Sequence, residues 1–81
     1  GNDQSVVESL SGLIRSARPY LLSEIYKRTS ETQRRDFHKL LTRELGYRVY
    51  RSEPYTRLQA EELGAGDMMR AEHFDIFCVP S

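Results

Sequence analysis

The chain has 81 residues, of which 38% are hydrophobic and 30% are charged, and its formal net charge at pH 7 is zero. This composition is typical of one folded domain and excludes a long disordered or low-complexity chain. No apolar run reaches the roughly 20 residues that a membrane-spanning helix needs. Because the chain begins with Gly1 and not with Met, we expect a single domain, residues 1–81, cut from a longer protein.

The single cysteine, Cys78, excludes an internal disulfide and fits a reducing compartment, the nucleus or the cytoplasm. Together with His38 and His73 it matches no compact metal-ligand spacing, so we expect no metal site and no cofactor. His38 and Asp36 lie two residues apart on a predicted helix and point in different directions, so they do not form a catalytic pair. We therefore expect a protein that is not an enzyme.

Charge is distributed unevenly along the chain. Residues 1–14 contain two acids and no base, residues 15–57 contain eleven bases and five acids, and residues 58–81 contain one base and five acids. The local net charges are therefore −2, +6 and −4. A basic middle between acidic ends indicates an acidic partner for the central part of the chain.

Two helices are expected in the first third of the chain. Ser5 and Glu8 have capping-box spacing, which predicts the start of a helix. The apolar residues that follow recur at helical spacing and form one stripe: Val6, Leu10, Leu13 and Ile14. Residues 20–28 form a second apolar stripe at helical spacing, which predicts a short helix that starts on Pro19. For so short a stretch, a strand is the competing interpretation.

A third helix is the clearest element of the sequence. Ser30 and Gln33 have capping-box spacing, and Gly46 stands where a C-terminal cap belongs. Between them, one stripe of apolar residues predicts the buried side of the helix: Phe37, Leu40, Leu41 and Leu45.

Two strands are expected in the remaining chain. Residues 47–52 are β-prone and alternating, and Pro54 ends them. Residues 73–79 alternate again, with one side formed by Phe74, Ile76 and Cys78. The connector between the strands has acidic residues, a helical-cap spacing at Thr56 and Gln59, and a turn at 64–66. We therefore predict an α+β domain of three helices and a small two-stranded antiparallel sheet, with one face of the sheet on the helices.

The third helix carries the candidate functional residues. At about 100° per residue, its apolar stripe lies on one side, and Arg35, Lys39 and Arg43 lie on the opposite side. His38 lies between the two sides, and Arg34 lies near the edge of the apolar one. Further bases precede and follow the helix: Lys27, Arg28, Arg48 and Arg51. These nine residues form the predicted nucleic-acid-binding site, because arginine and lysine pair with phosphates and with guanine.

Two other interpretations of this basic side stay open. A protein–protein interaction module would use the same side to bind an acidic tail or a helix of a partner. Exposed helix faces are also charged in most soluble domains, where lysine and arginine serve only solubility.

The order of the elements resembles a winged-helix domain. The resemblance runs from Leu21 to Arg28, through a turn, to the helix from Arg34 to Leu45, and on to the sequence Gly-Tyr-Arg-Val-Tyr-Arg that begins at Gly46. In that family, the second of two closely spaced helices recognises DNA, and a two-stranded wing follows. The resemblance therefore implies DNA binding by the third helix.

A second resemblance points to the same helix. Arg34 and His38 form the sequence Arg-x-x-x-His, which is similar to the small α+β module named for this motif. That module binds single-stranded nucleic acid. Gly64, Gly66 and Arg70 occupy places that resemble its glycine loop and the arginine that follows. The resemblance implies a single-stranded DNA or RNA ligand.

Overall fold

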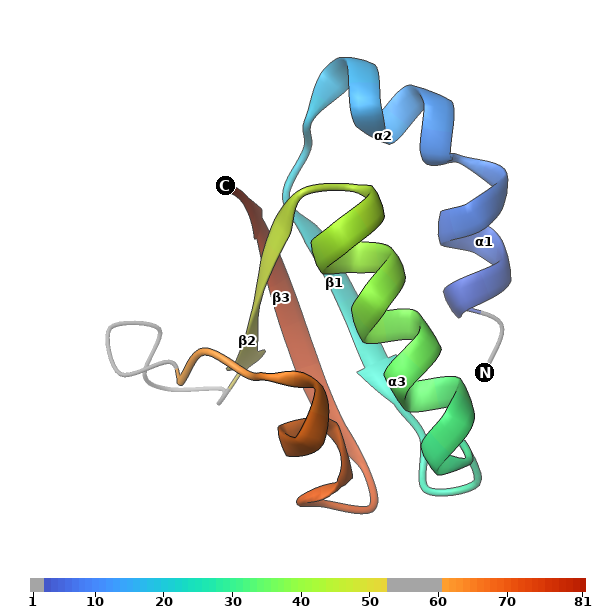
Figure 1. The fold of residues 1–81 in the computed structure, drawn as a ribbon, viewed down its shortest axis with the longest axis vertical. Coiled ribbons are helices and arrows are strands. Elements are labelled where there is room, and N and C mark those ends of the chain that lie inside the picture. Colours follow the sequence, from blue (N-terminus) through green and yellow to red (C-terminus); the bar gives the residue numbers. More distant parts are fainter. Residues whose placement is uncertain (1–2, 53–60) are drawn as a thin grey trace.

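The computed structural model describes residues 3–52 and 61–81 (Figure 1). They form three α-helices and one three-stranded antiparallel sheet. The elements follow in the order α1 (Asp3–Ser9), α2 (Ser11–Ala17), β1 (Leu21–Ile25), α3 (Glu31–Lys39), the π-helical turn η1 (Leu40–Glu44), β2 (Tyr47–Ser52), the 3₁₀ turn η3 (Ala65–Met69) and β3 (Phe74–Pro80). The α+β class is as predicted, and the sheet has one strand more than predicted.

The additional strand is β1, which replaces the helix predicted at residues 20–28. Leu21 and Ile25 point inward and pair with Cys78 and Phe74 of β3. A spacing of four residues keeps two side chains on one side of either a helix or a strand, so the pattern did not decide between them. Leu22, which the predicted helix would bury, is 76% exposed.

The strand order is β1-β3-β2, so β3 lies in the middle and is antiparallel to both neighbours. β1 and β2 therefore run parallel to each other, and α3 makes the crossover between them on one face of the sheet (Figure 1). The predicted inward residues of β3 are confirmed: Phe74, Ile76 and Cys78 are at most 7% exposed.

The predicted inward side of the third helix is also confirmed. The side chains of Phe37, Leu40, Leu41 and Leu45 are all buried. Ser30 accepts a hydrogen bond from the backbone of Gln33, whose side chain accepts one from the backbone of Ser30, so the capping box is present. Gly46 follows with a positive φ of 74°, which favours glycine.

The N-terminal segment differs from the prediction. One helix was predicted to begin at Ser5. The structure has two short helices instead, α1 from Asp3 and α2 from Ser11, which are separated by Leu10. Of the predicted stripe only Ile14 is buried, whereas Val6, Leu10 and Leu13 are 46–63% exposed. Helical periodicity indicates that residues share a side, but it does not indicate that this side meets the core.

The structure describes the connector between β2 and β3 from residue 61 onward. Glu62 bridges to Tyr50, and the Leu63 amide donates a 2.8 Å hydrogen bond to the Val49 carbonyl, so this segment lies along the edge of β2. The amide of Gly64 donates to the Asp67 carboxylate at the start of η3. The helical cap predicted at Thr56 and Gln59 lies outside the described residues.

Candidate nucleic-acid interface

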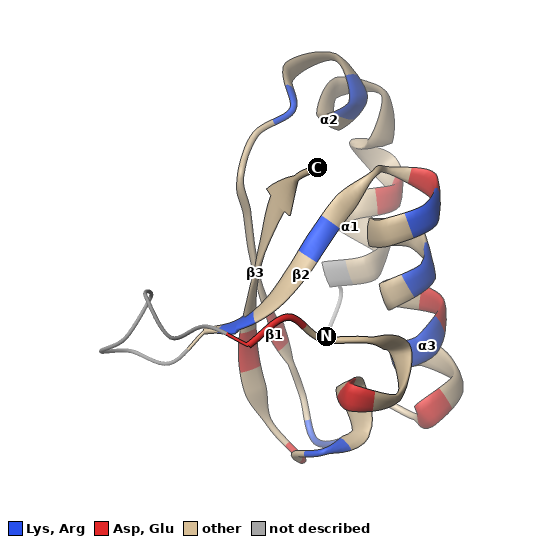
Figure 2. Ribbon diagram, turned by 60° about the vertical axis from the view of Figure 1, so that its left-hand side comes forward, with Lys and Arg blue, Asp and Glu red and all other residues tan. Residues whose placement is uncertain are grey.

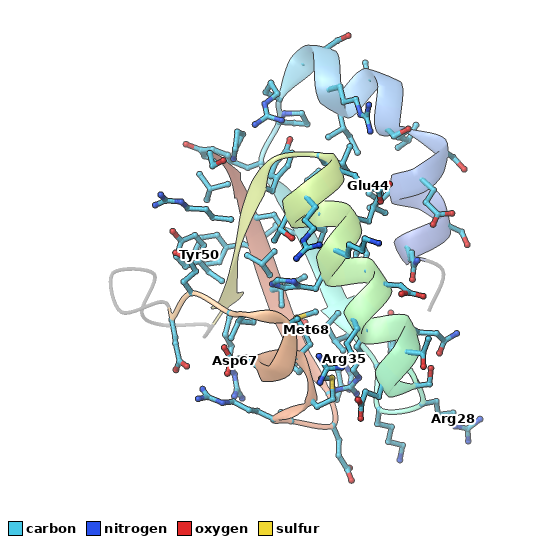
Figure 3. All side chains as sticks on the ribbon, viewed as in Figure 1. Arg28, Arg35, Glu44, Tyr50, Asp67 and Met68 are labelled. Carbon is cyan, nitrogen blue, oxygen red and sulfur yellow. The ribbon has the colours of Figure 1, made fainter. Side chains whose placement is uncertain are left out.

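The outward side of α3 and η1 carries a row of cations at a spacing of four residues. Arg35, Lys39 and Arg43 are all exposed, whereas Phe37 and Leu41 behind them are buried. The helix therefore presents the three side chains that the sequence predicted on its outward side. The row runs from near Arg35 in Figure 3 toward the end of the helix marked by Glu44.

Acidic residues lie between these cations. The Arg35 Nε donates a 3.0 Å hydrogen bond to Glu31, and both side chains are about half exposed or more. Asp36 is also exposed beside the row. Figure 2 accordingly shows basic and acidic bands alternating along α3. Within the described part of the chain, no carboxylate lies within 4.0 Å of Lys39 or Arg43, so these two cations are the best placed to meet a phosphate.

Arg34 lies inside the domain, although the sequence placed it among the contact residues. Its side chain is only 5% exposed. The guanidinium donates hydrogen bonds of 2.6–3.2 Å to five backbone carbonyls, those of Tyr26, Thr29, Met68, Ala71 and Glu72. This is the full capacity of an arginine, which has five N–H donors. Arg34 therefore joins the loop after β1, helix α3 and the connector before β3.

His38 also binds the connector. Its Nε2 lies 2.8 Å from the Leu63 carbonyl oxygen, which can only accept, so Nε2 carries a hydrogen and donates. The ring is partly buried on the flank of α3. Both residues of the Arg-x-x-x-His sequence thus donate hydrogen bonds to backbone carbonyls of residues 63–72 and hold this segment against the helix.

The four flanking bases do not all lie beside the row. Lys27 and Arg28 are exposed in the turn between β1 and α3, and Figure 3 shows Arg28 at the end of the domain where α3 begins. Arg48 is exposed on the face of the sheet away from α3, because its neighbours Tyr47 and Val49 point into the core. Arg51 is on the inner face instead, with its guanidinium 5.7 Å from the centre of the Phe74 ring.

Arg18 is a residue that the sequence reasoning missed. Its backbone is left-handed, with φ of 52°, and its guanidinium donates to the carbonyls of Leu45 and Gly46. The cation thus neutralises carbonyls at the C-terminal end of the helix. It also lies 5.0 Å from the centre of the Tyr47 ring. No short-range pattern marks this contact, because its partners are 27 and 28 residues away.

Other chemistries find little support in the geometry. The described residues contain no group of three or more His, Cys, Asp or Glu side chains that could hold a metal ion. Burial raises the pKa of the Cys78 thiol to about 12, so the thiol stays protonated at neutral pH and is a poor nucleophile. Among the same residues, no helix is long and apolar enough to cross a membrane.

Comparisons with protein-family models, with curated proteins and with solved structures found no match to this chain. The geometry of the domain is the basis for the function proposed below.

Proposed function

We propose that this domain is a non-catalytic nucleic-acid-binding module of the nucleus or cytoplasm, and that it contacts DNA or RNA through the outward side of α3 and η1. The observation that carries the proposal is the pair Lys39 and Arg43, exposed one helical turn apart on the side opposite the core. Four residues of helix span about 6 Å, so both cations can meet phosphates of one strand.

Arg35 becomes a third phosphate contact when its guanidinium leaves the ion pair with Glu31 and binds a phosphate. An exposed pair of this kind is worth only a few tenths of a kcal/mol, so the exchange costs little. Lys27 and Arg28 extend the positive surface at the beginning of the helix. Arg34 and His38 do not contact the nucleic acid in this proposal, because their N–H groups donate hydrogen bonds to backbone carbonyls. Their role is to hold the connector beside α3.

The small number of unpaired cations predicts weak and salt-dependent binding. With the two contacts of Lys39 and Arg43 alone, the slope of log affinity against log salt is about −2 for duplex DNA and somewhat shallower for a single strand, and each further contact from Arg35, Lys27 or Arg28 adds almost one unit. Base readout is not part of the proposal.

The test is fluorescence anisotropy with short single- and double-stranded oligonucleotides. Lys39→Glu should weaken binding at low salt, and the double change Lys39→Glu with Arg43→Glu should abolish it. Arg15→Glu is the matched control, since it makes the same charge change at an exposed residue of α2. Equal affinity of Lys39→Glu and Arg15→Glu would overturn the assignment of the surface, and no binding by the parent chain would overturn the function.

A protein partner on the same side of α3 is the second candidate. The observation that favours it is the alternation of charge, because Glu31 pairs with Arg35 and the exposed Asp36 lies beside the row. A mixed surface of this kind suits a partner that also carries both signs. The parent chain would then bind no oligonucleotide at low salt.

A further inference from the structure

The face of the sheet away from the helices carries an apolar row across all three strands. Leu22 of β1 and Tyr50 of β2 are both in register with Phe77 of β3. The rings of Tyr50 and Phe77 are stacked, with centres 5.1 Å apart and planes 17° from parallel. A sheet face that meets only water is usually polar, whereas the middle of this face is apolar on all three strands.

A shallow hollow lies over the same row. Its volume is about 220 Å³, and it is lined by Tyr20, Leu22, Ser52, Phe77 and Val79. Tyr20 and Leu22 are 78% and 76% exposed, the two highest values among the large hydrophobic residues described. Figure 2 shows that the helices cover the opposite face of the sheet. In Figure 3, Tyr50 lies on the side of β2 that faces away from α3. Contiguous exposed apolar surface of this kind marks an interaction site.

Opposite charges lie at the two ends of this face. Arg48 is exposed beside Val79 at one end. Asp75 and Glu24 are exposed and in register with each other at the opposite end. The two ends are four residues apart along β3, which is roughly 13 Å.

We propose that this face binds a second copy of the same chain, with the two sheets packed face to face. The two copies would be related by a two-fold axis that lies between the two sheets and is perpendicular to the strands. About this axis, the strands of one copy run opposite to the equivalent strands of the other copy. This arrangement brings Arg48 of each copy over the end that carries Asp75 in the other copy. The apolar row of Leu22, Tyr50 and Phe77 meets its own equivalent. Such a self-complementary patch is what an isologous dimer requires.

The charges disfavour nucleic acid as the occupant of this face. Among the described residues of the three strands, two carboxylates on this face, Glu24 and Asp75, outnumber the one cation, Arg48, so these strands repel phosphate on balance. An unrelated protein partner would account for the apolar row but not for charges that complement each other about one axis.

The dimer is expected to be weak. Three strands about 4.8 Å apart give each copy a footprint well below the roughly 800 Å² per partner of a standard interface. We therefore expect a monomer–dimer equilibrium that is visible only at high protein concentration.

Analytical ultracentrifugation over a concentration series up to about 1 mM tests the proposal. Leu22→Glu should raise the dissociation constant at least tenfold, because it buries a charge in the apolar row. Thr32→Glu is the matched control on α3, where it adds the same negative charge at an exposed residue on the helix side of the sheet. It should leave the dissociation constant unchanged. A chain that stays monomeric throughout the series, or a control that weakens the dimer as much as Leu22→Glu, would overturn the proposal.

A charge exchange distinguishes a second copy from any other occupant. Arg48→Glu and Asp75→Arg should each weaken the dimer severalfold, since each places like charges opposite one another. The double variant restores opposite charges across the axis and should regain the affinity of the parent chain. Failure of the double variant to recover would contradict the two-fold arrangement, as would oligonucleotide-induced amide shifts centred on Tyr50 and Phe77.

Discussion

The guanidinium of Arg34 donates a 2.7 Å hydrogen bond to the carbonyl of Met68, so the first turns of α3 hold a segment that lies 34 residues later in the chain. Met68 is itself fully buried. The contact holds the connector before β3 near η3, whereas the hydrogen bonds of Leu63 to Val49 and His38 hold its earlier part. An arginine that the sequence placed among the nucleic-acid contacts therefore stabilises the packing of the connector against α3.

Arg34→Lys should destabilise the fold by about 2 kcal/mol or more. Lysine has three donors at a single nitrogen, so it cannot serve five carbonyls spread around a planar guanidinium. The neighbouring Arg35→Lys is the matched control and should stay within about 0.5 kcal/mol, because Arg35 makes only an exposed pair with Glu31. Urea unfolding measures both. Equal unfolding midpoints for the two variants would show that the Arg34 contacts contribute little.

Leu41→Ala should cost about 2–5 kcal/mol, a large part of the stability of so small a domain. Leu41, in the turn η1 that continues α3, is 1% exposed in the core. Leu13→Ala removes the same atoms from an exposed site and should change the free energy of unfolding by less than about 0.5 kcal/mol. Thermal or urea unfolding compares them, and a Leu41→Ala variant as stable as Leu13→Ala would mean that the inward side of α3 is wrongly assigned.

Stability should fall as the pH rises above about 9. Burial raises the pKa of Cys78 from 9.0 to about 12, and burial also raises the pKa of Tyr47. Between pH 9 and 12 the unfolded chain loses the thiol proton while the folded chain keeps it, so alkali favours unfolding; below this window the thiol has no effect. Urea midpoints measured from pH 7 to about pH 10.5 should decline less steeply for Cys78→Ala than for the parent. Identical pH profiles would contradict the burial of the thiol.

The acids of the connector should weaken nucleic-acid binding by occupying a cation. Arg70 is ion-paired with Glu61 and Asp67, and it lines a shallow hollow together with Lys27. Glu61→Gln with Asp67→Asn should free Arg70, tighten binding at low salt and steepen the salt slope by almost one unit. Anisotropy over a salt series measures both quantities. If affinity and slope both equal those of the parent, Arg70 lies outside the contact surface.

Periodicity in the sequence predicted those parts of the fold that depend on local geometry. The capping box at Ser30, the inward stripe of α3 and the alternation of β3 follow from neighbours a few residues apart. The sequence favoured a helix at β1, because the spacing of four residues between Leu21 and Ile25 fits both the helical period of about 3.6 residues and the strand period of about 2. The identity of β1 depends on pairing with β3, whose partner residues lie 49 to 57 positions later in the chain.

The candidate site was predictable only in part, for the same reason. The outward positions of Arg35, Lys39 and Arg43 follow from the helix alone. The burial of Arg34 depends on carbonyls brought to it by η3 and the segment before β3, which no helical pattern reveals. The acids Glu31 and Asp36 were present in the sequence, but a net charge summed over residues 15–57 did not show that they lie beside the outward cations.

Amide chemical-shift titration with short single- and double-stranded oligonucleotides tests the central claim most directly, because it detects weak binding and locates the surface. The account predicts shifts that grow with oligonucleotide concentration at Lys39 and Arg43, extend to Lys27 and Arg28, and shrink as salt is added. Shifts absent from α3, or present there for the Lys39→Glu and Arg43→Glu double variant as strongly as for the parent, would contradict it.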